Sequence, residues 1–328
     1  MQVAILSART GWHTRELRRA LRARGHASRV VAYEHLVASF GAARPAPDPA
    51  RVVAVRGRRS AGLAPGAPAR TLSSGGLSLL DADAVLARII PAGSLEQIIF
   101  RVDALHWIEE HGTAVMNTPR AIERCVDKFY TDALLREAGV PTPETVVCEG
   151  LERALEAVRA MGEVVIKPIF GSMGHGLVRV GDPDLAYRVF RALDRTGAVF
   201  YVQRAVPHEG RDLRVFVVGG RVLGAIERRA AAGEWRANVA RGARAAPVAL
   251  PAAWEALALR AAAAVGADYA GVDLLPGDDG SALVLEVNGI PGWQGLQRAT
   301  GIDVAGAIVE HLIARVGRAR GPAAERPA

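Results

Sequence analysis

The chain has 328 residues, of which 50% are hydrophobic and 23% are charged. This length favours two or three domains that share a cleft, and the composition excludes a chain that is disordered throughout. The apolar run at the amino terminus is too short for a secretory signal, and no run of about 18 apolar residues occurs, so we expect a soluble, cytoplasmic protein without a membrane partner.

The net charge of +7 comes mainly from arginine, because only two of the 41 basic residues are lysines, Lys128 and Lys167. The arginines are scattered and are not grouped with aromatic residues, which favours an anionic small ligand over nucleic acid. A nucleic-acid-binding protein remains the alternative of another class. In so arginine-rich a chain, positions that keep a compact ammonium group are candidates for a point-charge role. Cys125 and Cys148 lack a metal-binding spacing and are expected to be reduced packing residues.

The amino-terminal part is expected to be a small α/β domain that closes near residue 118. Its hydrophobic periodicity predicts a strand at 2–7, a helix at 14–24, and strands at 28–33 and 82–90, then a helix at 94–112 and a short strand at 113–119. The segments 41–50 and 57–76, rich in Gly, Ala, Pro and Arg, are expected to be loops.

A glycine-rich segment follows a helix at 127–138, a strand at 144–148, a helix at 151–161 and an apolar strand at 163–169. It contains Gly171, Ser172, Gly174 and Gly176, and a second strand comes directly after it. Rossmann and Walker loops are excluded because both require a helix after the loop. A glycine hairpin can instead close its backbone N–H groups over a triphosphate, with Lys167 as the positive charge. A plain glycine-rich hairpin is the alternative.

The apolar strand at 198–206 carries Gln203 and Arg204 and leads into a loop with proline. Such a strand could offer backbone donors and acceptors to an adenine edge, although the pattern alone favours an ordinary core strand. Two apolar strands at 210–229, joined at Gly219-Gly220, then predict a hairpin. Asp212 and Arg214 share one face of its first strand, and Arg228 lies near the end of its second, as the sequence shows.

A second hairpin is predicted by the segments 267–276 and 281–292 around a Gly-Asp-Asp-Gly turn. Glu286 and Asn288 are two residues apart in one strand, so they share a face about 7 Å apart, and Asp273 lies on the partner strand. Two carboxylates and an amide oxygen suit Mg²⁺, and burying both carboxylates is costly unless a cation compensates them. A structural ion pair with a nearby arginine is the alternative.

In their order along the chain, these motifs resemble the RimK family of ATP-grasp ligases, and the resemblance covers most of residues 1–314. It extends through 235–242, 291–295 and 300–306, which read WRANVARG, PGWQG and TGIDVAG. The resemblance implies an α/β protein, in part α+β, with the ATP-grasp fold. It implies an amino-terminal pre-ATP-grasp domain at 1–118, a lid subdomain at 119–205, a second subdomain with the metal site at 206–314, and a tail at 315–328 that we expect to be disordered.

The resemblance also implies roles for individual residues. Nucleotide phosphates would be bound by the two lysines and by the glycine loop. Adenine would be held by the strand around Gln203 and Arg204, the ribose side would face Asp212, and the phosphates and the reacting carboxylate would face Arg228 and Asn238. The ligands of Mg²⁺, or of Mn²⁺ as a substitute, would be Asp273, Glu286 and Asn288. Many family members carry an acidic residue where this chain has Arg204, which leaves the purine contact open.

The implied reaction transfers the γ-phosphoryl group of ATP to a carboxylate, and an amine then attacks the acyl phosphate to form an amide. The resemblance favours L-glutamate as the amine. The acceptors left open are a pterin coenzyme such as tetrahydromethanopterin, a deazaflavin coenzyme, and a carrier-protein or ribosomal-protein tail. The segments 88–94 and 290–297 are most similar to the pterin branch. Arg88 is a candidate anchor for an anionic acceptor, a phosphotransferase is an alternative enzyme class, and a homo-oligomer remains open.

Overall fold

The computed structural model describes residues 1–41, 70–171, 174–231, 233–236, 242–277 and 279–320. The chain divides into two compact units. The first combines Met1–Pro119 with the carboxyl-terminal residues from Ile308 onward, and the second is Arg120–Ala307. No helix in the described ranges has both the length and the apolar character needed to cross a bilayer.

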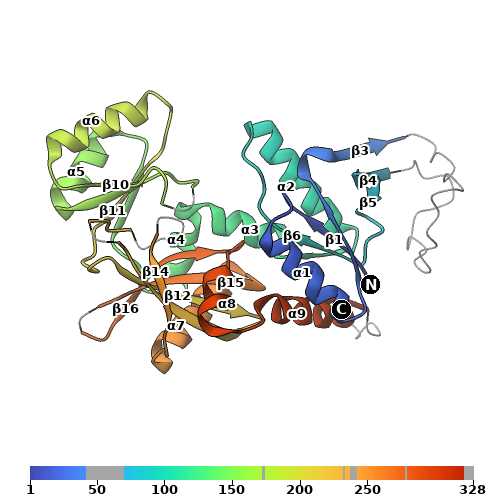
Figure 1. The fold of residues 1–328 in the computed structure, drawn as a ribbon. Coiled ribbons are helices and arrows are strands. Elements are labelled where there is room, and N and C mark those ends of the chain that lie inside the picture. Colours follow the sequence, from blue (N-terminus) through green and yellow to red (C-terminus); the bar gives the residue numbers. More distant parts are fainter. Residues whose placement is uncertain (42–69, 172–173, 232, 237–241, 278, 321–328) are drawn as a thin grey trace, which may run out of the picture. The chain divides into compact units, whose positions relative to one another are not determined.

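The first unit contains a parallel four-stranded sheet in the order β2-β1-β6-β7 (Figure 1). Its strands are β1 (Gln2–Leu6), β2 (Ala27–Val31), β6 (Ala84–Ala87) and β7 (Ala114–Met116). The crossover helices are α1 (Trp12–Ala23) and α2 (Leu95–Glu110). Ser94 caps α2, because its side chain accepts from Gln97 N at 3.3 Å while Gln97 Oε1 accepts from Ser94 N at 3.0 Å. The α/β character expected for this part of the chain is confirmed.

A three-stranded sheet in the first unit was not expected from the sequence. It has the order β3-β4-β5 and consists of β3 (Leu36–Phe40), β4 (Arg70–Ser74) and β5 (Leu77–Ser78), with the short 3-10 helix η1 (Tyr33–His35) before it. Strand β4 lies inside the segment 57–76 that we expected to be a loop. The strand forms because Leu72 is buried and Ser74 Oγ donates to Ala32 O at 2.7 Å. Residues 42–69 lie outside the described ranges.

The carboxyl-terminal helix α9 (Val304–Arg320) also corrects an expectation, because residues 315–320 were assigned to a disordered tail. Leu312 and Val316 are buried, and Arg315 Nη1 donates to Val115 O at 3.0 Å. These contacts continue the helix beyond residue 314. Residues 321–328 lie outside the described ranges.

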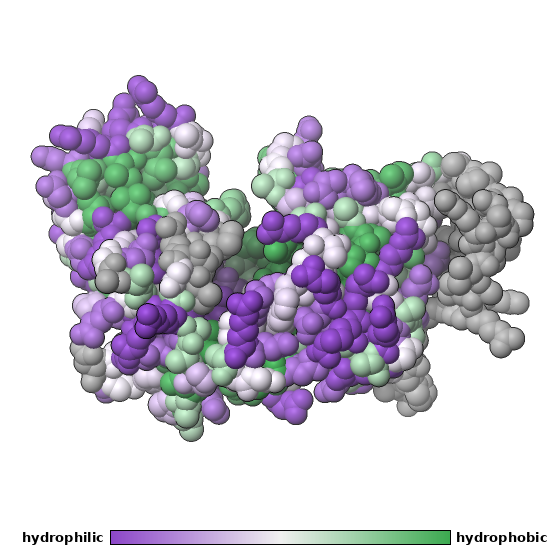
Figure 2. Space-filling view, viewed as in Figure 1, coloured by the Kyte–Doolittle hydropathy of each residue, from purple (hydrophilic) through white to green (hydrophobic). Residues whose placement is uncertain are grey.

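The second unit begins with two helices, α3 (Pro119–Val126) and α4 (Lys128–Glu137), and an antiparallel sheet in the order β10-β9-β11-β8. Its elements are β8 (Thr145–Cys148), α5 (Leu151–Met161), β9 (Val164–Lys167), β10 (Val178–Val180), α6 (Pro183–Asp194) and β11 (Phe200–Arg204). Helices α5 and α6 pack on this sheet, and Figure 2 shows hydrophobic surface gathered around their position.

Alternation along the strands of this sheet separates a core face from a pocket face. Val164, Ile166 and Val202 belong to the core beneath α5 and α6. Their neighbours Lys167 and Gln203 line the pocket described below. Period two thus places polar side chains of β9 and β11 on one surface.

The remainder of the second unit is built on a five-stranded antiparallel sheet in the order β14-β13-β12-β15-β16. Its elements are β12 (Arg211–Val218), β13 (Arg221–Arg229), β14 (Arg244–Pro247), α7 (Ala252–Val265), β15 (Tyr269–Pro276), β16 (Ala282–Asn288) and α8 (Gln294–Thr300). Helix α7 packs on its apolar face, where Val215, Val272 and Val284 form part of the core. The other face carries Asp212, Arg214 and Asp273.

Candidate active site

An open pocket of about 950 Å³, including solvent at its mouth, lies within the second unit and is lined from both of its sheets. Ten of the residues predicted from the sequence line it: Lys128, Lys167, Gly171, Gly174, Gln203, Arg204, Asp212, Arg228, Asp273 and Glu286. Gly176 and Asn288 are described but are not among its lining residues. Ser172 and Asn238, also predicted, lie outside the described ranges.

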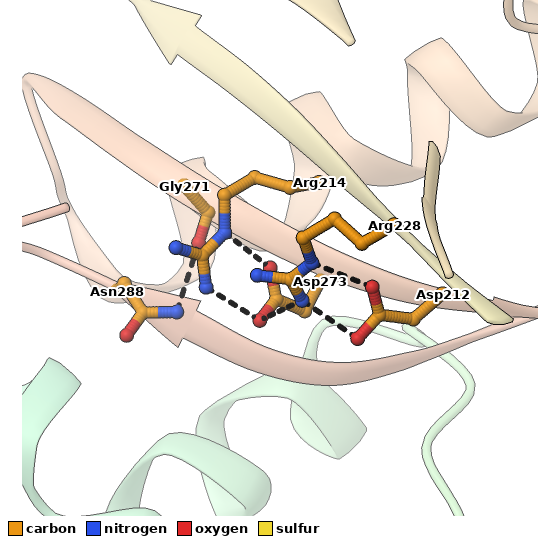
Figure 3. A network of polar contacts seen from close by, with 6 residues as sticks. All are labelled: Asp212, Arg214, Arg228, Gly271, Asp273 and Asn288. Atoms are coloured by element: carbon orange, nitrogen blue, oxygen red, sulfur yellow. Dashed lines mark hydrogen bonds and ion pairs between the residues drawn. The ribbon is translucent and has the colours of Figure 1, made fainter. Parts of the chain in front are cut away.

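A ladder of alternating charges crosses strands β12, β13 and β15 at the floor of the pocket (Figure 3). Arg228 donates through Nε and Nη2 to the two oxygens of Asp212, both at 2.6 Å. Its Nη2 also lies 2.9 Å from Asp273 Oδ2. Arg214 donates through Nε and Nη2 to the two oxygens of Asp273, both at 2.7 Å. The structural ion pair that we considered as an alternative at Asp273 is therefore present, with two arginines.

Burial and charge compete at these acids. Burial raises the pKa of Asp212 to about 6, although Arg228 opposes the shift. Burial would also raise the pKa of Asp273, but Arg214 and Arg228 outweigh it and lower the pKa below its usual value. Asp273 is therefore held as a carboxylate although it is only 3% exposed.

Asp273 nevertheless keeps capacity for a metal ion. A carboxylate offers about four lone-pair positions. The two contacts to Arg214 and the one to Arg228 use three of these, two on Oδ2 and one on Oδ1. Among the described residues, no contact uses the remaining position on Oδ1, so both arginine contacts are compatible with a cation at that oxygen.

The other predicted metal ligands lie on β16. Glu286 is directly opposite Asp273 in the β15–β16 register, and it lines the pocket. Figure 3 draws one orientation of the Asn288 amide, in which Nδ2 donates to Gly271 O at 3.4 Å. The network favours the reverse amide orientation, in which Asn288 donates to Glu286 Oε1 at 3.1 Å and accepts from Arg214 Nη2 at 3.2 Å. Two opposed carboxylates fit Mg²⁺, and the Asn288 oxygen keeps a second lone pair for it after accepting from Arg214. No group of three or more His, Cys, Asp or Glu side chains that could hold a metal ion occurs in the described ranges, here or elsewhere.

The two lysines of the chain lie on the pocket wall. Lys128 Nζ donates to Gly171 O at 3.0 Å and to Ile169 O at 3.3 Å, so it anchors the start of the glycine loop. Lys167 Nζ donates to Gln203 Oε1 at 2.6 Å. Burial lowers the pKa of both ammonium groups, to about 8 for Lys167, and Glu286 partly opposes each shift. Cations this poorly hydrated can gain strongly from a phosphate partner.

The glycine loop is shaped by its contact with Pro168. A side chain on Gly171 would meet Pro168 Cγ at 3.1 Å, and one on Gly176 would meet it at 3.3 Å. Gly176 also has φ of +74°, which disfavours other residues. At the other end of the loop, Arg236 Nη1 donates to Gly174 O at 3.3 Å, and Glu234 holds the Arg236 guanidinium. Arg236 lines the pocket but was given no role from the sequence, although it lies in the 235–242 motif, because its contact with Gly174 is a tertiary one.

Among the described residues, the strand expected to hold adenine is followed by one backbone N–H without a hydrogen-bond partner. Arg204 N donates to Glu144 O at 2.8 Å and Ala205 N donates to Glu163 O at 2.9 Å, so both N–H groups are used by the sheet. The Arg204 side chain pairs with Glu144 and donates through Nη1 to Met161 O at 2.7 Å. Val206 lines the pocket, and its N–H has no partner among the described residues. The sequence could not identify Val206, because the partner strands decide which N–H groups are free.

Two antiparallel sheets with a glycine-rich hairpin, one buried and one half-buried lysine, and a carboxylate pair define the class of protein, an ATP-grasp enzyme. The model of the RimK-like ATP-grasp domain matches residues 125–312, and the chain belongs to that family. It is an ATP-grasp ligase, as the resemblance of its ordered motifs to this family predicted.

The chain is similar to named ligases in sequence and to solved ATP-grasp structures in fold. The tetrahydromethanopterin:alpha-L-glutamate ligase of Methanosarcina acetivorans is 37% identical over 272 residues, which cover 75% of this chain and 84% of that protein. A probable alpha-L-glutamate ligase of Trichodesmium erythraeum is 35% identical, covering 76% of this chain and 83% of that protein. Among solved structures, the ATP-grasp ligase PsnB in complex with minimal precursor, Mg and ADP has a TM-score of 0.68 and 23% identity, and the match covers 96% of this chain and 98% of that one.

Proposed function

We propose that the chain is an ATP- and Mg²⁺-dependent ligase that joins the amino group of L-glutamate to a carboxylate of a small-molecule acceptor. The observation that carries the proposal is the opposed pair of Asp273 and Glu286, with one lone-pair position left on Asp273, in a pocket walled by two lysines. The name of the Methanosarcina acetivorans relative supports glutamate as the amine and a tetrahydromethanopterin-type coenzyme as the acceptor.

Asp273, Glu286 and Asn288 would hold the metal, with Mg²⁺ as the first choice and Mn²⁺ as a substitute. When bound, the ion would neutralise charge on the nucleotide phosphates. Lys128 and Lys167 would contact the same phosphates with their remaining ammonium protons. The net charge of these five side chains is zero, so a divalent cation is needed before they favour a polyanion.

Arg228 would face the transferred group. Its Nε and Nη2 are used by the two aspartates, whereas its Nη1 forms no hydrogen bond within the described ranges, and the residue lines the pocket. Because both carboxylates fix the guanidinium plane, Nη1 is a preorganised donor for a phosphoryl or carboxylate oxygen. Asn238, the second residue proposed for this role, lies outside the described ranges.

The nucleoside would bind at the other end of the pocket. Val206 N–H is the free backbone donor for the adenine edge. Asp212 retains a lone pair on each oxygen after binding Arg228, so it can accept a ribose hydroxyl. The Arg236 contact with Gly174 would hold the glycine loop over the phosphates, which would keep water from the acyl phosphate.

The test is ADP release by the full chain with Mg·ATP and a tetrahydromethanopterin-type acceptor, with and without L-glutamate. Turnover should need all components, and hydroxylamine should trap an acyl phosphate when glutamate is omitted. Activity only with a peptide or carrier protein that ends in a carboxylate would assign a protein acceptor instead. An amine-independent, acid-stable phosphorylated product would indicate a phosphotransferase, and salt-sensitive nucleic-acid binding without ATP affinity would refute the ligase.

A further inference from the structure

Gln203 is almost fully buried, with 2% of its surface exposed, near the carboxyl end of β11, an inner strand of the sheet β10-β9-β11-β8. It lies on β11 between Thr145 of β8 and Val165 of β9, and both are its direct cross-strand neighbours. Gln203 was predicted to contact adenine, but its side chain forms a different set of contacts. These contacts connect it to Lys167.

The hydrogen bonds around Gln203 form a chain with a single direction. Lys167 has only donors, so Gln203 must present its oxygen to Lys167 Nζ, at 2.6 Å. Gln203 Nε2 must then donate, and it does so to Thr145 Oγ1 at 3.0 Å and to Tyr201 Oη at 3.2 Å. Thr145 Oγ1 can accept because its own proton goes to Pro143 O at 2.9 Å. A proline carbonyl can only accept, so both ends of the chain fix the orientation of the amide.

The same contacts leave Gln203 little capacity to recognise a base. Both amide protons are used by Thr145 and Tyr201, and one lone pair of the oxygen is used by Lys167. The remaining lone pair lies beside a buried ammonium group. An adenine edge would have to displace a contact of this chain before it could bind the amide.

We propose that Gln203 is a positioning residue that holds the Lys167 ammonium group in place for the nucleotide phosphates, and that Thr145 and Tyr201 hold Gln203. The proposal rests on the proposed function, in which Lys167 contacts those phosphates. Lys167 forms no other hydrogen bond within the described ranges, so two of its protons remain for the pocket. The Tyr201 ring also lies near this ammonium group, with its centroid 6.0 Å from Nζ.

A neutral amide suits this task better than a carboxylate. It accepts one proton of Lys167 and leaves the positive charge available to the phosphates. Glutamate at this position would form a buried ion pair with Lys167 and compete with the phosphates for its charge. Methionine would fill the same space without accepting a hydrogen bond, and Lys167 would lose its fixed position.

The experiment compares Gln203→Glu, Gln203→Met, Thr145→Val and Thr145→Ser in the full chain. Calorimetry in the presence of Mg²⁺ measures the Kd of ADP, tripolyphosphate and adenosine, and thermal melting checks the fold. We expect Gln203→Glu and Gln203→Met to raise the Kd of ADP and of tripolyphosphate by the same factor, on the order of 10-fold. Adenosine binding should not change. Thr145→Val, which lacks the hydroxyl that accepts from Gln203, should weaken tripolyphosphate binding by about 3-fold. Thr145→Ser keeps the hydroxyl and should bind tripolyphosphate like the wild type.

Lys167→Met distinguishes failure of this proposal from failure of the proposed function. If Lys167→Met abolishes tripolyphosphate binding while the Gln203 variants bind it normally, Gln203 does not position Lys167 and the ligase proposal stands. If adenosine binding falls together with ADP binding, Gln203 recognises the base and the positioning role is wrong. If Lys167→Met binds tripolyphosphate like the wild type, the phosphate site itself is misassigned.

Discussion

Replacing either opposed carboxylate should stop the reaction, but only one replacement should also destabilise the protein. Asp273→Ala removes two contacts to Arg214 and one to Arg228 and leaves both guanidinium groups without their shared partner. Breaking a buried ion pair from one side costs about 3–5 kcal/mol. For a chain of this size each kcal/mol lowers Tm by about 2–4 °C, so we expect Tm to fall by about 10 °C.

Glu286→Gln is the matched variant. Glu286 lines the pocket opposite Asp273, but it forms no ion pair in the described ranges. Its loss should therefore leave Tm within about 2 °C of the wild type and reduce ADP release below detection. Melting curves and ADP release at several Mg²⁺ concentrations measure both effects. Equal Tm values for the two variants would refute the ion-pair reasoning, and normal turnover by Glu286→Gln would refute the metal assignment.

Three further predictions concern the pocket wall. Because burial lowers the pKa of Lys167 to about 8, tripolyphosphate affinity should fall as pH rises past 8. Free lysine titrates near 10.4, so between about pH 8 and 10.4 the unfolded chain binds more protons than the folded one. The free energy of unfolding, measured by denaturation, should therefore rise with pH in this window. An unchanged affinity for tripolyphosphate at pH 9.5 would contradict the phosphate-binding role of Lys167. Arg236→Gln removes the contact to Gly174 and should raise the KM for ATP several-fold at nearly constant Tm, whereas an unchanged KM would show that the contact is incidental. Gly176→Ala places a side chain at a φ of +74° and against Pro168, so it should lower the free energy of unfolding by about 1–2 kcal/mol and lower kcat. Gly233→Ala, at a φ of +82° but with no neighbour within 4 Å, is the control for backbone strain alone.

The elements that carry the site could be predicted where local pattern determines them. The hairpin of β15 and β16 has two largely apolar strands around a glycine turn, and the face shared by Glu286 and Asn288 follows from the period of two along a strand. The partners of Asp273 could not be predicted, because they depend on β12 lying between β13 and β15, an order that local sequence does not encode. The sequence offered either a metal or an arginine pair at Asp273, and the geometry leaves room for both.

Gln203 illustrates the same limit. Its position at the end of an apolar strand suggested a nucleoside contact, but the direction of its amide depends on Thr145, which lies 58 residues away. Strand β4 and the last turns of α9 were missed for a related reason, since each is held by tertiary contacts and its own residues show weak periodicity. The family resemblance, by contrast, rested on an ordered set of motifs and is confirmed.

The charge ladder restricts which changes this arginine-rich chain can tolerate. Arg228 reaches Asp212 and Asp273 at once through a planar group, which an ammonium group cannot do. Lys128 and Lys167 are the opposite case, because each directs a compact charge at one or two oxygen atoms in a confined space. Arginine and lysine can replace each other more readily where neither makes a bidentate contact. In this pocket they cannot, and a change on the ladder can persist only if its partner changes with it.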